Sequence, residues 1–428
     1  MSIVKTRLHR ATLLERLGPG VITGAADDDP SGIATYSQAG AGFGLNMLWT
    51  MVLTFPLMAA VQMIAARIGR VTGQGLAANI KEVFPGPVVL VLVALLFVAN
   101  TINIGADLAA MGEAAGMVIG QGDGPWYAVG FGVISLLLQL LMPYHRYVRV
   151  LKWLTLVLFA YVAVVMVVHV DWAEAGARIV RPQLKLDRAA ITLIVAVFGT
   201  TISPYLFFWQ SSQEVEEIKD HDDAEPLIDK PAQARRELRR IRWETYIGMA
   251  FSNLIAMAIM IATAATLNAK GLTNIQTAAQ AAEALRPVAG QFAFLLFALG
   301  IVGTGLLAVP VLAGSTAYAM AEVQGWRSGL ELKPRQAVGF YAVIAAAVCI
   351  GILLDFSPLD PIKALVWAAV INGVISVPIL VVMMLVASRR DQMGRFVASF
   401  GQRLFGWAAT GVMAVAVVAM IATSLPLN

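Results

Sequence analysis

Long apolar runs recur along the whole chain, separated by short polar stretches. Many of these runs approach or exceed ~18 residues, the length that a helix needs to cross the hydrocarbon core of a bilayer. The pattern predicts eleven membrane-spanning helices, with centres near residues 31, 57, 101, 134, 158, 203, 255, 307, 345, 373 and 414. We therefore expect an all-α, polytopic membrane protein.

Composition agrees with this class. Hydrophobic residues make up 58% of the 428 residues, charged residues make up 14%, and mean hydropathy is +0.74, far more apolar than a soluble domain. Residues 1–16 are basic but lack the apolar core and cleavage site of a secretory signal, so we expect them in the mature protein. The single cysteine, Cys349, excludes an internal disulfide and a cysteine-based metal cluster.

The basic residues alternate between successive predicted loops. With the N-terminus inside, cytoplasmic segments hold 24 of the 31 Lys and Arg residues, and outer segments hold 7. Because basic loops favour the cytoplasm, we expect a cytoplasmic N-terminus, Asn428 outside, and a plasma (inner) membrane location. The net charge of +4 then reflects topology, and the sequence indicates the bilayer as a partner, no nucleic acid and no obligate protein partner.

The largest polar segment is Lys219 to Arg240, between the sixth and seventh predicted spans. Acidic and basic residues alternate there in blocks that can pair. The segment is too short for a catalytic domain, and we expect a solvated cytoplasmic helix.

The first predicted span is interrupted by polar residues. Asp27, Asp28 and Asp29 are followed by Pro30, Ser31 and Gly32. Proline removes a backbone donor and clashes with the preceding turn, so the helix should unwind near Asp29. A charge inside the membrane is costly and is rarely kept for packing, which favours a functional role for Asp29. For Asp27 and Asp28, ligation and a place in an aqueous vestibule both remain open.

The sixth predicted span repeats this interruption, with Gly199-Thr200-Thr201-Ile202-Ser203-Pro204 inside an apolar segment. Pro204 alone could be a simple kink. Breaks in spans one and six match if five spans repeat, and an odd number of spans makes the repeats inverted. We expect one transmembrane domain over residues 1–428, a LeuT-like 5+5 inverted repeat at about 17–170 and 189–388, and an extra helix at about 404–425. Matched breaks point to a substrate site near the midplane.

These features resemble the Nramp family of divalent metal transporters over nearly the whole chain. The family has eleven spans, breaks in helices 1 and 6, and an Asp-Pro-Gly-Asn motif shortly after Gly-Pro-Gly. Here Gly18-Pro19-Gly20 precedes Asp29-Pro30-Ser31-Gly32. The resemblance implies metal binding at Asp29, at Gly32 in place of the asparagine, at the Thr200 carbonyl, and at Ser203.

Two departures bear on the ion that is carried. Ser203-Pro204-Tyr205 stands where the family has Met-Pro-His, so a hard hydroxyl replaces the thioether that prefers Mn²⁺ and Fe²⁺. Gly32 should widen the pocket, and Asp27 and Asp28 add hard oxygen that suits a partly hydrated ion such as Mg²⁺. The pattern resembles the Nramp-related magnesium transporter branch more than the manganese and iron branch.

Little in this sequence indicates that metal transport is coupled to proton transport. The family's sixth helix usually carries histidines where this chain has Tyr205 and Gln210, and none of the four histidines lies near a break. Protons could still pass through Asp27, Asp28, Asp107 or Glu113. We expect transport driven by membrane potential.

Other polar residues lie inside predicted spans. Asn100, Asn103 and Asp107 share one helix face and could line the pathway, although the asparagines could equally form a hydrogen-bonded seam between helices. Asn372, near Pro378, lies close to where the family places a polar ligand. Gly40 and Gly44 indicate close helix packing. Lower-ranked pathway candidates are therefore Asp27, Asp28, Asn103, Asp107, Gln210 and Asn372.

The sequence favours transport of a divalent cation, Mg²⁺ or Mn²⁺, by alternating access, with the ion as substrate and no cofactor. No HExxH, GxSxG or clustered-histidine motif indicates an enzyme. A transporter of amino acids or other organic solutes has the same architecture, but three aspartates beside the half-helix would repel a substrate carboxylate. A passive cation channel stays open as a third class.

Overall fold

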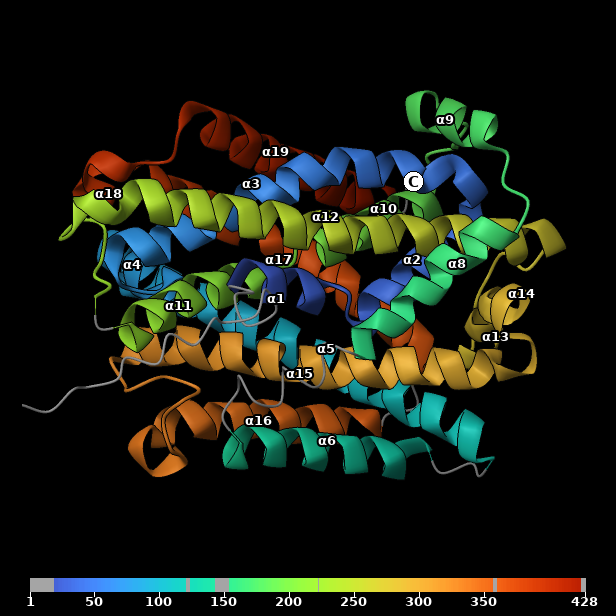
Figure 1. Cartoon of the computed structure of the whole chain (residues 1–428), viewed down its shortest axis with the longest axis horizontal. Coiled ribbons are helices and arrows are strands. Elements are labelled where there is room, and N and C mark those ends of the chain that lie inside the picture. Colours follow the sequence, from blue (N-terminus) through green and yellow to red (C-terminus); the bar gives the residue numbers. More distant parts are fainter. Residues whose placement is uncertain (1–18, 121–123, 143–153, 222, 357–359, 425–428) are drawn as a thin grey trace, which may run out of the picture.

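The computed structural model describes residues 19–424 apart from 121–123, 143–153, 222 and 357–359 (Figure 1). Every regular element in these residues is helical. The long helices are α3 (Leu48–Thr72), α5 (Gly86–Ile119), α6 (Gly124–Leu141), α12 (Ala234–Thr266), α15 (Ala293–Gln324), α16 (Val338–Asp355), α17 (Pro361–Ser388) and α19 (Phe400–Ser424). The all-α membrane fold is thus confirmed.

The predicted number of spans agrees with these helices once one turn is recognised. By length and composition, nine described helices can cross a membrane, or ten if the bent pair Leu156–Val167 and Trp172–Val180 is one span. One of these segments, Pro30–Thr72, contains two predicted spans. Figure 1 shows the chain turning back between α2 (Pro30–Phe43) and α3, at Gly44, whose φ is 58°. Counting the bent pair as one span, and α2 and α3 separately, gives the eleven predicted spans.

Both predicted breaks are present. In the first span, two residues separate the end of α1 (Pro19–Asp27) from the start of α2 at Pro30. In the sixth, α10 (Arg188–Thr201) is followed by α11, which begins at Pro204 and ends at Asp220. Each proline occupies the first position of its half-helix, where a missing N–H leaves no hydrogen bond unmade. The prolines therefore start new helices, and neither is a simple kink.

Glycines bring the backbones of the broken helices against their neighbours. A Cβ atom added at Gly24 would lie 2.4 Å from the carbonyl oxygen of Gly248 in α12, and one at Gly40 would lie 2.2 Å from that of Met260. One at Gly199 would lie 2.0 Å from the carbonyl oxygen of Ala369 in α17. The expectation of close packing at Gly40 is confirmed. The first span is thus pressed against α12 along both of its halves.

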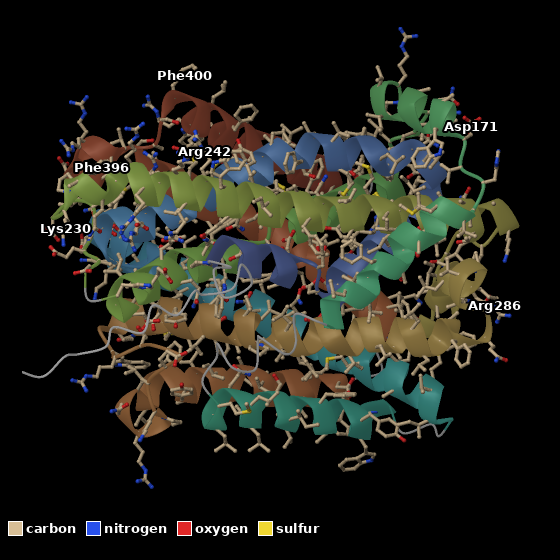
Figure 2. All side chains as sticks on the ribbon, viewed as in Figure 1. Asp171, Lys230, Arg242, Arg286, Phe396 and Phe400 are labelled. Carbon is tan, nitrogen blue, oxygen red and sulfur yellow. The ribbon has the colours of Figure 1, made fainter. Side chains whose placement is uncertain are left out.

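Charged residues collect at the two ends of the bundle. Figure 2 shows Lys230 and Arg242 at the left end and Asp171 and Arg286 at the right. The loops predicted to be cytoplasmic and outer thus lie at opposite ends. Short helices cover these ends: α4 (Leu76–Val83) and α18 (Arg390–Met393) on the left, and α9 (Trp172–Val180), α13 (Ala278–Ala282) and α14 (Arg286–Ala289) on the right.

The prediction that Lys219 to Arg240 forms a helix of its own is wrong. The segment is divided between the end of α11, a loop, and the first turns of α12. The loop packs on α3, where the N–H groups of Leu227 and Ile228 each donate to a carbonyl oxygen, at 3.2 Å. These hydrogen bonds give the two backbone N–H groups of the loop the partners that a helix would otherwise supply.

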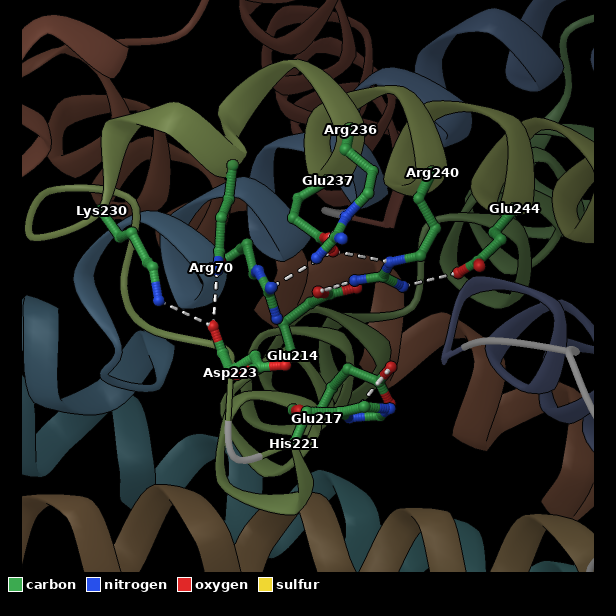
Figure 3. Close-up of polar contacts among 11 residues, drawn as sticks. Arg70, Glu214, Glu217, His221, Asp223, Lys230, Arg236, Glu237, Arg240 and Glu244 are labelled. Carbon is green, nitrogen blue, oxygen red and sulfur yellow. Dashed lines mark hydrogen bonds and ion pairs between the residues drawn. The ribbon is translucent and has the colours of Figure 1, made fainter. Parts of the chain in front are cut away.

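An ionic cluster fastens the start of α12 to α11 and α3 (Figure 3). Arg240 contacts Glu237 at 3.1 Å, Glu244 at 2.9 Å and Glu214 of α11 at 2.5 Å, and Arg70 of α3 contacts Glu237 at 3.2 Å. The side chains of Arg70 and Glu214 are almost fully buried. Within Lys219 to Arg240, the expected pairing of charges is present between Glu237 and both Arg236 and Arg240, and between Lys230 and Glu225.

Candidate functional site

Asp29 occupies the gap in the first span and caps the second half-helix. Its Oδ1 accepts hydrogen bonds from the N–H of Gly32 and the hydroxyl of Ser31, both at 2.7 Å. The carboxylate thus lies at the positive end of the α2 dipole, which stabilises its charge in a residue that is 2% exposed. Its second oxygen, Oδ2, is directed towards α5.

Helices α5 and α17 complete a polar cluster around Asp29. Asn103 Nδ2 donates to Asp29 Oδ2 at 3.2 Å and to Asp107 Oδ2 at 3.1 Å. Asn372 Nδ2 in turn donates to Asn103 Oδ1 at 3.0 Å. The structure therefore brings together four sequence-predicted residues from three spans.

Asn100 lies on the same face of α5 as Asn103 but belongs to a packing seam. Its amide donates to the carbonyl of Leu312 and to the hydroxyls of Ser315 and Thr316, all in α15. The alternative of an interhelical seam thus holds for Asn100, and Asn103 belongs to the polar cluster.

The second break lies against the first. A Cβ atom added at Gly32 would be 3.1 Å from the Thr200 hydroxyl oxygen and 3.3 Å from the Tyr36 ring. The hydroxyl of Tyr205 donates to the carbonyl of Ala26 at 3.2 Å, which joins α11 to α1. The expected widening of the pocket beside Gly32 is not observed, because Thr200 and Tyr36 fill that space.

Ser203 stands at the N-cap position of α11, but its hydroxyl bonds back to α10 and makes no capping hydrogen bond to α11. Its hydroxyl donates to the carbonyl oxygens of Gly199 and Thr200, at 2.9 and 2.8 Å. Because the proton points at these carbonyls, the lone pairs of the Ser203 oxygen remain available as acceptors. Ser203 and the Thr200 carbonyl are thus neighbouring hard oxygen donors.

Asp27 and Asp28 are buried and share one donor. The hydroxyl of Ser252, in α12, donates to Asp27 at 2.7 Å and to Asp28 at 3.0 Å, and both carboxylates are at most 2% exposed. They therefore do not form a solvated edge in this structure. Ser252 was not among the residues predicted from the sequence, although it is a polar residue inside an apolar span.

Gln210 lies apart from the polar cluster. The Thr23 hydroxyl donates to its side-chain oxygen, which links α11 to α1. No described hydrogen bond joins Gln210 to Asp29, so its place in the pathway remains a prediction.

Several oxygen atoms in the polar cluster and in the neighbouring Asp27 and Asp28 accept no hydrogen bond within the part of the chain that the structure describes. Asp27 Oδ1, Asp28 Oδ2, Asp107 Oδ1 and Asn372 Oδ1 are buried and accept no hydrogen bond from any described residue. Buried polar atoms are normally satisfied, so these oxygens favour a cation or water as a partner. Across the described chain, no three Asp, Glu, His or Cys side chains form a metal cage by themselves. Hydroxyl, amide, carbonyl and water oxygens would have to supply the other ligands.

The site residues are shut off from solvent in this structure. Every predicted site residue with a side chain is 2% exposed or less: Asp27, Asp28, Asp29, Asn103, Asp107, Thr200, Ser203, Gln210 and Asn372. An ion can therefore reach Asp29 only after helices move.

The family model described as natural resistance-associated macrophage protein-like, Nramp, matches residues 20–423. The chain belongs to the Nramp family. This confirms the family resemblance found from the sequence. Since Nramp proteins are transporters, the enzyme class is excluded.

Two relatives match along almost the whole Nramp chain. A divalent metal cation transporter MntH of Burkholderia ambifaria is 27% identical over 412 residues, which cover 94% of this chain and 87% of the relative. An MntH of Deinococcus radiodurans is 28% identical over 418 residues, covering 95% and 88%.

Solved structures confirm the fold. The manganese transporter of Eremococcus coleocola aligns with a TM-score of 0.72 at 18% identity, covering all of this chain and 91% of the other. Mhp1, a nucleobase-cation-symport-1 family transporter, aligns with a TM-score of 0.60 at 14% identity, covering 96% and 94%. The broken-helix fold is therefore shared by transporters whose substrates differ.

Proposed function

We propose that this Nramp protein imports divalent metal cations, most favourably Mg²⁺ and Mn²⁺, through the polar cluster at its two broken helices. The observation that carries the proposal is the position of Asp29. Its carboxylate lies in the break of the first span, next to the break of the sixth, and an amide from α5 links it to a second buried carboxylate, Asp107. Because an intramembrane carboxylate is costly, such an arrangement favours a cationic substrate.

The proposed ligands are hard oxygens. Asp29, the carbonyls near Gly32 and Thr200, and the Ser203 hydroxyl would hold the ion, with Asp107 and Asn372 next to it. Mg²⁺ keeps several waters and binds through one or two carboxylates, which suits a cluster with few charged ligands. Without a thioether at position 203, preference for soft metals should be weak.

Alternating access accounts for the closed site. Asp29 lies at a junction of α1, α2, α5 and α10, and the first span packs backbone to backbone on α12. We propose that this packed unit rocks against the remaining helices and opens the cluster to one side at a time. The plasma membrane and a cytoplasmic N-terminus are part of the proposal, because basic residues favour that orientation.

An organic solute is the less favoured substrate. The fold alone does not decide, since MhsT in complex with L-phenylalanine also aligns, with a TM-score of 0.59. Family membership and the buried carboxylates favour a cation. Three adjacent aspartates would also repel a substrate carboxylate.

Uptake into liposomes tests the proposal. Purified protein would be reconstituted, and Mg²⁺ and Mn²⁺ entry recorded with fluorescent reporters, with and without an imposed pH gradient. Asp29→Asn is the informative variant, because an amide oxygen can still accept the Gly32 N–H and preserve the helix cap while the charge is lost. Asp391→Ala, at an exposed position of α18, serves as the control.

We expect uptake by the wild type and by Asp391→Ala, and none by Asp29→Asn. Indifference to the pH gradient would support transport without proton coupling. Equal uptake by wild type and Asp29→Asn would overturn the proposed site. Absence of uptake for both ions by folded protein would overturn the metal assignment.

A further inference from the structure

The first turns of α12 carry a second row of arginines, separate from the ionic cluster. Arg235, Arg239 and Arg242 are spaced four and three residues apart, so they share one helix face. All three are exposed, and no described carboxylate pairs with any of them. The acidic neighbours Glu237 and Glu244 are occupied by Arg240 in the ionic cluster (Figure 3). This face of α12 therefore has an excess of positive charge.

These arginines border a groove between three helices. The groove has a volume of about 770 Å³ and is lined by α3, α12 and the start of α19. Pro56, Ala60 and Met63 of α3 form an apolar wall, and Phe405 of α19 faces the arginines. Figure 1 shows α19, α3 and α12 next to one another in the upper part of the bundle, away from α6 and α16. The arginines and Trp243 at the rim of the groove are exposed, so the groove opens to the outside of the bundle.

Arg67 lies in the same groove and is held in place. Its Nη1 donates to the carbonyl oxygens of Phe396 and Val397, at 3.2 and 3.0 Å. Its Nε is buried and has no partner among the described residues. A guanidinium fixed in this way retains donors for an anion without losing further side-chain freedom.

The surroundings place the groove at the depth of lipid headgroups. Trp243 is 56% exposed and Phe400 75% exposed, next to the row of arginines. Tryptophan is enriched at the membrane–water interface. Figure 2 shows Arg242 and Phe400 in the left half of the molecule, the half that also carries Lys230. Apolar side chains continue from the groove along α3 towards the middle of the bundle.

We infer that this groove binds the phosphodiester headgroup of an anionic phospholipid. Guanidinium groups bind phosphate oxygens in paired hydrogen bonds, and basic pockets between membrane helices select anionic lipids. The apolar wall of α3 would accommodate an acyl chain. A lipid seated there would touch α3, α12 and α19 at once.

Such a lipid would also touch α12, the helix that contacts Asp27 and Asp28 next to the polar cluster. Ser252, which binds Asp27 and Asp28, lies on the same helix as Arg242, ten residues further on or about 15 Å along the axis. A headgroup that joins α12 to α3 and α19 would restrain the helix on which the first span packs.

Lipid retention by the full-length protein tests the inference without reference to transport. Protein in detergent would be titrated with phosphatidylglycerol or phosphatidylcholine, and binding followed by native mass spectrometry and by the midpoint of thermal unfolding. The test variant is R235Q/R239Q/R242Q. The matched control R327Q/R335Q/R390Q removes the same charge from exposed arginines that do not line the groove.

We expect phosphatidylglycerol, and not phosphatidylcholine, to bind and stabilise the wild type and the control. The groove variant should bind phosphatidylglycerol roughly 100-fold more weakly, since each arginine near anionic lipid contributes about a five-fold factor. The single variant R239Q should show about a five-fold loss, which keeps the test valid if the triple variant fails to fold.

Two results would overturn the inference. An equal loss of binding in the groove and control variants would mean that surface charge alone attracts the lipid. Glycerol phosphate that stabilises the wild type as strongly as phosphatidylglycerol would mean that the groove binds soluble phosphate and has no use for an acyl chain.

Discussion

The side-chain amide of Asn103 lies 3.2 Å from the Oδ2 atom of Asp29, so a residue of the intact third span contacts the gap in the first. The same amide also reaches Asp107, at 3.1 Å. One nitrogen thus holds two carboxylates close together in the middle of the bundle. Such a pair of negative charges is unfavourable unless a cation or protons accompany it.

Asn103 should therefore be needed for affinity although its amide nitrogen cannot ligate a cation. Asn103→Ala removes the donor that orients both carboxylates. Loss of a partner that orients a metal ligand typically lowers metal affinity about 10- to 100-fold. Titration calorimetry with Mn²⁺ and Mg²⁺ would measure the change.

Asn100→Ala provides the control, because Asn100 is equally buried on the same face of α5 and its hydrogen bonds to described residues all go to α15. We expect that variant to lose thermal stability and to keep its affinity for the ion. A similar loss of affinity in both variants would show that Asn103 acts only through packing.

Ser203 should control selectivity between hard and soft ions. Ser203→Met replaces a hydroxyl by a thioether, which favours Mn²⁺ over Mg²⁺. We expect the ratio of Mn²⁺ to Mg²⁺ affinity to rise about tenfold, or about 1.4 kcal/mol. Ser203→Ala removes the hydroxyl without adding sulfur and should lower both affinities at a constant ratio. Competition uptake assays with both ions would reveal an unchanged ratio in Ser203→Met, contrary to this prediction.

The sequence was sufficient to predict the spans and breaks because both depend on local rules. Runs of apolar residues are long enough to cross a bilayer, and Pro30 and Pro204 each stand where a helix must restart. Asp29, Asn103 and Asp107 were likewise recognisable as polar residues inside apolar spans, and the structure joins them.

Local rules could not predict contacts between helices that are far apart in the sequence. The sharing of Ser252 by Asp27 and Asp28 depends on how the first span packs on α12, which Gly24 and Gly248 allow by direct backbone contact. The Thr200 hydroxyl of α10 similarly fills space beside Gly32 that seemed open from residue types alone. The spacing of residue types along the chain shows which residues share one face of a helix. It does not show which other helix packs on that face.

The contact between Gly24 and Gly248 should tolerate no added methyl group. In Gly24→Ala the new Cβ would fall 2.4 Å from a backbone carbonyl, so the helices must separate. Overpacking of this kind costs about 1–3 kcal/mol or more, and it should also displace Asp27 from Ser252. We expect a lower midpoint of thermal unfolding and slower transport. Gly130→Ala is the comparison, because nothing lies within 4 Å of its added Cβ, and it should leave both properties intact.

Arg240 should be necessary for the stability of the α11–α12 contact because it neutralises Glu214. The Glu214 side chain is fully buried, and Arg240 is its ion-pair partner at 2.5 Å. Arg240→Gln would remove the ion-pair partner of that carboxylate and leave only the more distant charge of Arg70, and breaking a buried pair in this way costs about 3–5 kcal/mol. Thermal unfolding in detergent should show a large loss of stability, and E214Q/R240Q, which removes both charges, should recover most of it. Arg327→Gln, at an exposed position outside both the ionic cluster and the groove, should unfold like the wild type. R240Q and E214Q/R240Q could instead unfold at the same temperature. The loss of stability would then come from the missing packing of the arginine side chain and not from the unpaired charge of Glu214.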